Sequence, residues 1–339
     1  MQREAFIPGE EKKNLRGQIE MFEREIEASK NTGGAVIPVE IGDVCCAIEC
    51  ADEALGNLLR DWYGNFFSRR APDFTVRLSV VDGKSAPELK TALTEMRLKQ
   101  DGQRCAADNV ALETEFDEAN RTLQLRVERS FFDAGADFKL MNRVLPLVYY
   151  TVSNWKHDIR SVPILVHSSA VVRRGKALMF TGPSETGKTT AARLGSGDWA
   201  DVLNDEMNLV SRYRSSGEPV TARGVPILGG LPQRRNATAP LSCVFALKQG
   251  KETRVRPLNR VEAYLRFIRQ VISPAFLGQT DRQALFSLMA DFADEVTGTV
   301  PFYELEFSLD ETRFRNVLEA VENSLEKEEV KSGKLAGQD

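Results

Sequence analysis

Residues 182–189, with the sequence GPSETGKT, constrain the fold more than any other part of the chain. They fit the pattern G-x-x-x-x-G-K-[ST], in which a glycine-rich loop wraps its backbone amides around phosphate groups. The short apolar run 177–180 precedes them, and 190–194 suits a first helical turn that ends at Gly195 and Gly197. This order brings the loop amides and a helix N-terminus to one point of positive potential. The sequence therefore predicts a nucleoside triphosphate site.

Two residues of this segment have distinct expected roles. Lys188 is expected to reach the β- and γ-phosphates, and the Thr189 hydroxyl to complete the coordination of Mg²⁺. A chance match in a glycine-containing turn is the alternative, and the flanking strand and helix argue against it. The residues predicted to surround the phosphates are Gly182, Pro183, Ser184, Glu185, Thr186, Gly187, Lys188, Thr189 and Thr190.

Two carboxylates follow the loop. Phosphoryl transfer needs a metal that offsets phosphate charge and a group that orients or deprotonates the acceptor. Asp205 and Glu206 end a short apolar strand, whose end can open beside the phosphate loop in a parallel or mixed sheet. One carboxylate would hold the metal and the other would accept a proton, with Thr189 and Asp205 as the predicted metal ligands. The alternative is a solvated acidic turn, which the upstream loop disfavours.

These motifs, with residues 167–170, resemble the core of the HPr kinase/phosphorylase family, whose phosphate-loop fold is shared with phosphoenolpyruvate carboxykinase. The resemblance covers about residues 160–265 and is most specific at the phosphate loop. It implies ATP and Mg²⁺ as cofactors, with Asp205 and Glu206 at the family's double-aspartate position as metal contact and catalytic base. It also implies that His167 lies close to the phosphates; a structural histidine is the alternative.

Weaker likenesses extend further along the chain. Residues 220–225 resemble the family segment that carries an Arg-Gly pair, which implies that Arg223 stabilises charge on the transferring phosphoryl group. A surface arginine is the alternative. Residues 224–226, 240–241 and 245–247 are similar to uncharacterised HPr-kinase-like proteins encoded beside peptide-modification genes.

Two residues depart from the family pattern. Glu206 replaces the usual second aspartate and moves the carboxylate by about one methylene. Glu185 stands where a small glycine is usual, and its carboxylate repels a polyphosphate unless it turns outward.

The leading hypothesis is a Mg²⁺/ATP-dependent kinase that acts on a hydroxyl group of a protein or peptide, with serine as the expected acceptor. The departures favour the alternative, a nucleotide-binding assembly or switch protein with little or no transfer activity.

Composition limits the cellular setting and the partners. A formal net charge of −4 and a pI near 5.6 give no electrostatic case for a nucleic-acid partner. No apolar run has the length of a membrane span, and the N-terminus lacks a signal-type segment. We therefore expect a cytoplasmic protein whose partner carries the acceptor hydroxyl; a homo-oligomer is left open.

Cys45, Cys46 and Cys50 are predicted to pack as small hydrophobes in a buried strand, with metal or redox chemistry as the alternative.

A length of 339 residues suggests about two domains. The expected class is α/β, with a P-loop kinase domain on a central mixed sheet preceded by a smaller α+β domain. The expected divisions are an amphipathic helix (1–34), an α+β domain (35–157), the P-loop domain (158–325) and a flexible tail (326–339). Strands are expected at 35–39, 44–48, 74–80, 112–116, 122–127, 162–167, 170–172, 177–180, 200–206, 220–222, 225–228, 241–247, 253–255 and 302–307. Helices are expected at 52–67, 138–155, 260–272, 281–296 and 309–325.

Overall fold

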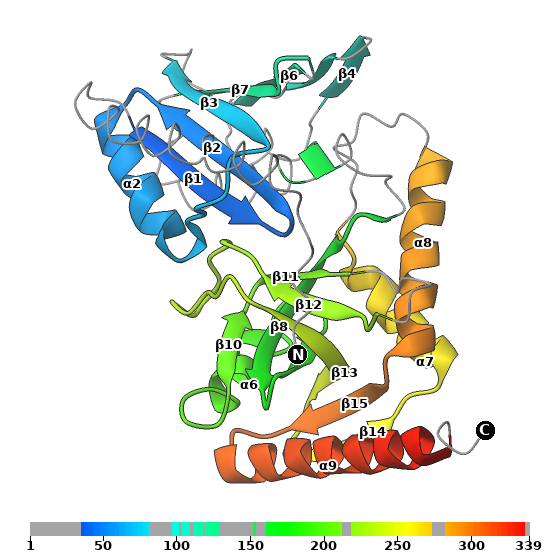
Figure 1. Cartoon of the computed structure of the whole chain (residues 1–339). Coiled ribbons are helices and arrows are strands. Elements are labelled where there is room, and N and C mark those ends of the chain that lie inside the picture. Colours follow the sequence, from blue (N-terminus) through cyan, green and yellow to red (C-terminus); the bar gives the residue numbers. More distant parts are fainter. Residues whose placement is uncertain are drawn as a thin grey trace. The chain divides into compact units, whose positions relative to one another are not determined.

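The computed structural model describes residues 35–81, 97–101, 104–108, 112–117, 119–128, 149, 152–153, 161–211, 218–272 and 282–335. The chain divides into two compact units (Figure 1). One consists of Met1–Lys156 with Phe276–Thr280, and the other of His157–Ala275 with Asp281–Asp339. The helix predicted over 1–34 lies outside the described residues, as does the one predicted over 138–155 apart from residues 149 and 152–153. No helix among the described residues is long and apolar enough to cross a membrane.

The first unit is built on a mixed sheet with the strand order β1-β2-β3-β7-β6-β5-β4. Its strands are β1 (Ala35–Ile41), β2 (Val44–Cys50), β3 (Phe74–Val81), β4 (Arg97–Asp101), β5 (Arg104–Asp108), β6 (Leu112–Asp117) and β7 (Thr122–Glu128). Helix α2 (Glu53–Tyr63) contacts β1 and β2 through the buried side chains of Leu55, Leu59 and Tyr63. Its first turn is capped by Asp52, whose carboxylate accepts the amide of Leu55. A short turn of 3₁₀ helix, η1 (Gly64–Phe66), follows it.

The predictions for this unit are largely confirmed. The expected strands and the helix at 52–67 are present, and the strands predicted at 112–116 and 122–127 pair as the hairpin of β6 and β7. Strands β4 and β5 were not predicted, because RLKQD and RCAAD lack a clear alternation of apolar and polar residues. Cys45, Cys46 and Cys50 are buried on β2 with free thiols, as expected of small hydrophobes. Burial raises the pKa of each of these thiols, which keeps them protonated.

The second unit contains an eight-stranded mixed sheet with the order β10-β8-β11-β12-β13-β15-β14, and β9 pairs with both β8 and β13. Its strands are β8 (Ile164–Arg173), β9 (Lys176–Thr181), β10 (Asp201–Asn204), β11 (Met207–Val210), β12 (Thr221–Gly224), β13 (Thr238–Gln249), β14 (Arg254–Pro257) and β15 (Phe302–Phe307). Strand β13 runs parallel to β9 and β15, and the other pairs in the sheet are antiparallel. The expected mixed sheet is therefore confirmed.

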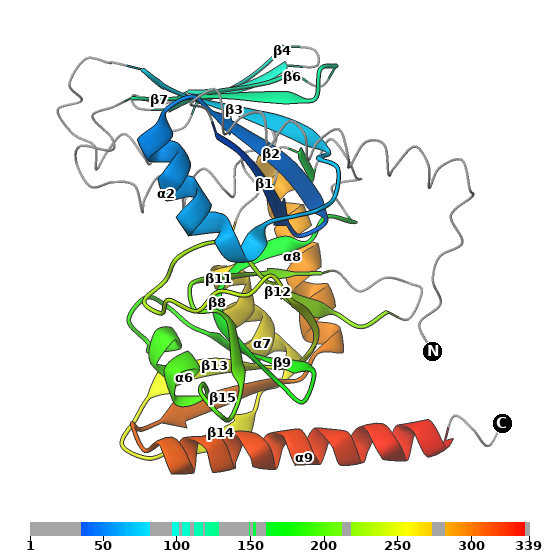
Figure 2. The same ribbon diagram turned by 60° about the vertical axis from the view of Figure 1, so that its left-hand side comes forward.

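Helices cover both faces of this sheet. They are α6 (Lys188–Leu194), α7 (Arg260–Phe267), α8 (Arg282–Thr299) and α9 (Glu311–Leu335), with η3 (Ile268–Gln270) after α7. Alternate strand residues point to opposite faces. On β9, Met179 packs in the core beneath α7 and α8, while its neighbours Leu178 and Phe180 pack beneath α6 and α9. Both views show α9 running beside β15 (Figures 1 and 2). The unit is a three-layer α/β/α arrangement.

Three expectations about elements were wrong. The strands predicted at 162–167 and 170–172 form the single strand β8, because Ser168 and Ser169 satisfy their hydroxyls on backbone carbonyls without leaving the sheet. Residues 225–228 are not a strand; the carbonyls of Val225 and Ile227 accept hydrogen bonds from a side chain instead of a neighbouring strand. The tail expected from residue 326 continues as helix α9 to Leu335, because its Glu and Lys residues favour helix. Residues 336–339 lie outside the described part.

The docking of α9 gives a test of this packing. Phe314 is fully buried and its ring contacts those of Phe180 and Phe307, whereas Phe286 on α8 is 66% exposed. Phe314→Ala should lower the free energy of unfolding by about 3–5 kcal/mol, because it leaves a cavity in a close-packed core. The matched change Phe286→Ala should cost less than about 0.5 kcal/mol. Urea denaturation followed by circular dichroism measures both; equal effects would contradict the assigned position of α9.

Candidate active site

The predicted strand, loop and helix are present as β9, residues 182–187 and α6. We call residues 182–187 the glycine loop. Its two glycines are required by their surroundings. A Cβ added to Gly182 would lie 2.6 Å from Thr186 Oγ1, and one added to Gly187 would lie 2.9 Å from Phe307 Cζ. Gly187 also has a φ of 98°, which side chains rarely adopt. The loop is thus held in one shape by β15 as well as by its own turn.

Lys188 is folded back over this loop. Its side chain is buried, and Nζ donates to the carbonyl oxygens of Gly182 at 2.9 Å and Pro183 at 3.1 Å. Burial lowers the pKa of Lys188, and the carboxylate of Glu206 acts in the opposite direction. The ammonium group is therefore held at the mouth of the glycine loop by neutral acceptors.

Glu185 occupies the loop position where the resemblance leads one to expect glycine. Its φ is 68°, in the left-handed region, and its side chain is exposed. Gln249 Nε2 donates to the Glu185 carbonyl oxygen at 2.7 Å, so the end of β13 holds this strained residue in place. The exposed side chain agrees with the outward orientation that a phosphate site requires.

The two carboxylates lie in a bend between β10 and β11, which both run antiparallel to β8. The register of the pairing shifts between Val202 and Asn204, so the chain leaves the ladder before it resumes at Met207. The side-chain oxygen of Asn204 accepts the backbone amides of Glu206 at 2.7 Å and Met207 at 2.9 Å. These two bonds fix the bend that carries Asp205 and Glu206.

Asp205 is fully buried. Its Oδ2 accepts the amides of Gly230 at 2.9 Å and Leu231 at 3.1 Å, and its Oδ1 has no hydrogen-bond partner among the described residues. A Cβ added to Gly230 would lie 3.6 Å from Asp205 Oδ2 and 3.7 Å from Thr189 Oγ1. Both predicted metal ligands thus lie within 4 Å of one point next to Gly230. The described residues contain no group of three or more His, Cys, Asp or Glu arranged to hold a metal ion.

Glu206 and His167 face each other, with His167 Nε2 3.7 Å from Glu206 Oε1. Both side chains are partly buried. Burial raises the pKa of Glu206, against the effect of Lys188, and burial followed by the charge of Lys188 lowers the pKa of His167. The structure therefore brings His167, Lys188 and Glu206 within electrostatic range of one another.

Arg223 lies further along the same sheet. It sits on β12 and pairs with Leu209 on β11. Met207, two residues before Leu209 on the same strand, pairs with His167 on β8. Because alternate residues share a face, the register puts Arg223 and His167 on one side of the sheet. Its Nη2 donates to Asn236 Oδ1 at 2.9 Å. Arg223 thus shares the face of the site but is one strand removed from the acidic bend.

Sequence reasoning missed two parts of the site. The amides that hold Asp205 belong to the segment 229–231, which follows the supposed strand at 225–228. Asn204, which shapes the acidic bend, belongs to the acidic motif but has no predicted role, because a lone asparagine at a strand end has many explanations. The Gly229-Gly230 dipeptide is a loop signal that was available. The contact of this dipeptide with Asp205 could not be predicted, because contacts between distant segments leave no local sequence pattern.

A family model described as SynChlorMet cassette protein ScmC matches residues 133–323, which is more than half of the chain. The chain belongs to the ScmC family. The match spans the whole of the candidate site in this ScmC-family chain, from His167 through the glycine loop and the acidic bend to Arg223. A comparison with curated proteins finds no match.

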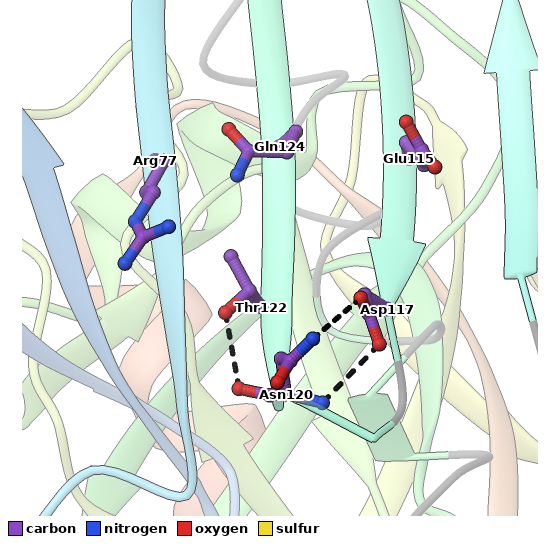
Figure 3. Close-up of a pocket in the computed structure, with 6 residues that line it drawn as sticks. All are labelled: Arg77, Glu115, Asp117, Asn120, Thr122 and Gln124. Carbon is purple, nitrogen blue, oxygen red and sulfur yellow. Dashed lines mark hydrogen bonds between the residues drawn. The ribbon is translucent and has the colours of Figure 1, made fainter.

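A second hollow lies on the sheet of the first unit and is not part of this site. It has a volume of about 440 Å³, and Figure 3 shows polar side chains from β3, β6 and β7 around it. Asp117 accepts the backbone and side-chain amides of Asn120, and Thr122 donates to the Asn120 carbonyl oxygen. These bonds are those of a hairpin turn, which accounts for three of the six lining residues.

The conformation of the glycine loop predicts opposite changes in Tm for substitutions of Glu185 and Gly187. Glu185→Gly should relieve backbone strain of about 1–2 kcal/mol, offset by roughly 0.5–1 kcal/mol of chain entropy, and should slightly raise Tm. Gly187→Ala should lower Tm clearly, because the added methyl group meets Phe307 at an unfavourable φ. Thermal denaturation without nucleotide tests both. A loss of stability in Glu185→Gly comparable to that in Gly187→Ala would show that the loop has a different conformation.

Proposed function

We propose that this ScmC-family chain is a Mg²⁺-dependent kinase that transfers the γ-phosphoryl group of ATP to a hydroxyl of a protein or peptide, with serine as the expected acceptor. One observation carries the proposal. A fully buried carboxylate, Asp205, has an oxygen without a hydrogen-bond partner among the described residues, and both this carboxylate and the Thr189 hydroxyl lie within 4 Å of the position that a Cβ on Gly230 would occupy.

Phosphate binding is assigned to the glycine loop and Lys188. The Lys188 ammonium now donates to two neutral carbonyl oxygens. Hydrogen bonds between a charged donor and a charged acceptor are roughly twice as strong as neutral ones, so phosphate oxygens would compete well for this group. The backbone amides of the loop supply further donors without requiring any charge. Lys188 would therefore bind and orient the β- and γ-phosphates.

The residues present fit a magnesium ion. A buried polar atom without a partner is unfavourable, and a divalent cation would satisfy Asp205 Oδ1. Mg²⁺ in phosphoryl-transfer sites typically takes one or two carboxylates and keeps several waters, so the small ligand set of Asp205 and Thr189 is adequate. When bound, the ion would offset negative charge on the phosphate oxygens.

The proton acceptor is assigned to Glu206. Asp205 Oδ2 already accepts two backbone amides and is thereby occupied. The Glu206 carboxylate accepts no hydrogen bond from the described residues and is partly open to solvent. It can therefore approach an acceptor hydroxyl and take its proton as the new bond to phosphorus forms. His167, 3.7 Å away, would orient this carboxylate.

The class of acceptor rests on resemblance. The motifs at the loop and the acidic bend are similar to those of the HPr kinase/phosphorylase family, which supports a protein or peptide substrate. A switch or assembly protein that binds nucleotide without transfer is the second candidate. It is favoured by the strained Glu185 in the glycine loop and by the longer side chain at Glu206. The two candidates share the nucleotide site and differ in turnover.

Nucleotide binding and hydrolysis by the full-length protein test the proposal. Lys188→Ala should weaken ATP binding by at least tenfold, and Asp205→Asn should retain ATP but lose Mg²⁺-dependent hydrolysis by about 100-fold or more. The exposed residues Lys327 and Asp198 provide matched controls, Lys327→Ala and Asp198→Asn, which should behave as wild type. Wild-type binding without turnover, tested with candidate acceptor peptides, would favour the switch. A wild-type protein that binds no ATP would overturn both candidates.

A further inference from the structure

The segment between β12 and β13, residues 225–237, is fastened along the strand that leads into the acidic bend. We call it the clasp loop. It is closed at its base by a hydrogen bond from the Gly224 amide to the Ala237 carbonyl oxygen at 3.1 Å. The Arg235 amide donates to Leu203, and the Arg235 guanidinium pairs with Asp201 at 2.6 Å. A Cβ on Gly224 would overlap with the Arg235 carbonyl oxygen, so the loop returns in direct contact with β12.

Asn204 joins the clasp loop to the acidic bend. This side chain is fully buried. Its Nδ2 donates to the carbonyl oxygens of Val225 at 2.8 Å and Ile227 at 2.6 Å, while its Oδ1 accepts the two amides of the bend. All four hydrogen-bonding positions of the amide are thereby used. A change in the position of the clasp loop must therefore be felt at Asp205 and Glu206.

The tip of the clasp loop lies directly against the Asp205 carboxylate. A Cβ on Gly229 would fall 2.6 Å from Asp205 Cγ and overlap with Oδ1. A Cβ on Gly230 would lie 3.0 Å from Thr189 Cγ2. No positive φ restricts Gly229 or Gly230, so space, and not backbone conformation, excludes side chains there. The two glycines allow backbone amides to reach one oxygen of the carboxylate.

We propose that the clasp loop and Asn204 are the positioning elements of the cation site. The amides of Gly230 and Leu231 engage Oδ2 and fix the rotation of the carboxylate, so that Oδ1, which accepts no hydrogen bond from the described residues, is the oxygen left for a divalent cation. This inference rests on the proposed function, because it assumes that Asp205 is a metal ligand. It adds that the strength of cation binding is set by a segment that itself contributes no ligand side chain.

The test separates metal-dependent from metal-independent nucleotide binding in the full-length protein. Isothermal titration calorimetry would measure the Kd of ATP in EDTA and in saturating Mg²⁺ for wild type, Gly229→Ala and Gly230→Ala. The matched control is Gly64→Ala, where an added Cβ meets nothing within 4 Å. We expect Gly229→Ala to reduce the Mg²⁺-dependent gain in affinity by about 10–100-fold while the Kd in EDTA stays unchanged. Gly230→Ala should have a smaller effect of the same kind, and Gly64→Ala none.

The outcomes distinguish this inference from the function on which it rests. A Mg²⁺-dependent gain in wild type that Gly229→Ala and Gly230→Ala both retain in full would overturn the inference and leave the proposed function standing. A wild type that binds ATP equally well with and without Mg²⁺ would overturn the metal role of Asp205 and the inference together. If Gly229→Ala does not fold, as judged by circular dichroism, the milder Gly230→Ala decides: a retained gain refutes the inference, and a reduced gain supports it.

Discussion

The hydrogen bonding of β8 along both its edges is the interaction on which the candidate site depends. On one edge β8 pairs with β10 and β11, and on the other with β9. The first edge delivers the acidic bend, which is tied to β8 by the Ser168 amide and the Glu206 carbonyl oxygen at 3.2 Å. The second delivers the glycine loop, and Ser169 Oγ donates to the Lys188 carbonyl oxygen at 2.7 Å. Because both tethers start from adjacent residues of one buried strand, the loop and the bend cannot shift independently.

Several unfavourable features of the structure gather at this point. Asp205 keeps a buried oxygen that accepts no hydrogen bond from the described residues, Glu185 has a left-handed backbone, and the Lys188 ammonium is buried against neutral carbonyls. Each is destabilising in the folded chain without ligand. A polyphosphate with a divalent cation would compensate the first and the third, and the second follows from the shape of the glycine loop. Destabilising features of this kind are expected to cluster at sites that bind a ligand.

How far the sequence predicts this site depends on the range of the interactions involved. The glycine loop was predicted from local signals, since its strand, turn and helix are consecutive in the chain. Asp205 and Glu206 were selected because carboxylates at a strand end beside such a loop have a defined use. The unbroken course of β8 through Ser168 and Ser169 was not predicted, because two hydroxyls between apolar runs look like a turn until their acceptors are known. The contact between Gly230 and Asp205 joins residues that are distant in the chain, and no local pattern records it.

The two proposed functions, kinase and switch, therefore differ in which groups one side chain, that of Glu206, can reach. The clasp loop engages Asp205 through two backbone amides on Oδ2, which leaves Oδ1 for the proposed cation. In the proposed kinase, proton transfer is assigned to Glu206, whose backbone is tied to the bend and whose carboxylate lies 3.7 Å from His167. The extra methylene relative to aspartate lengthens its reach from a bend whose backbone is fixed by Asn204. If that reach includes an acceptor hydroxyl, the proposed kinase is favoured; if it does not, the proposed switch, which would bind nucleotide and cation without turnover, is favoured.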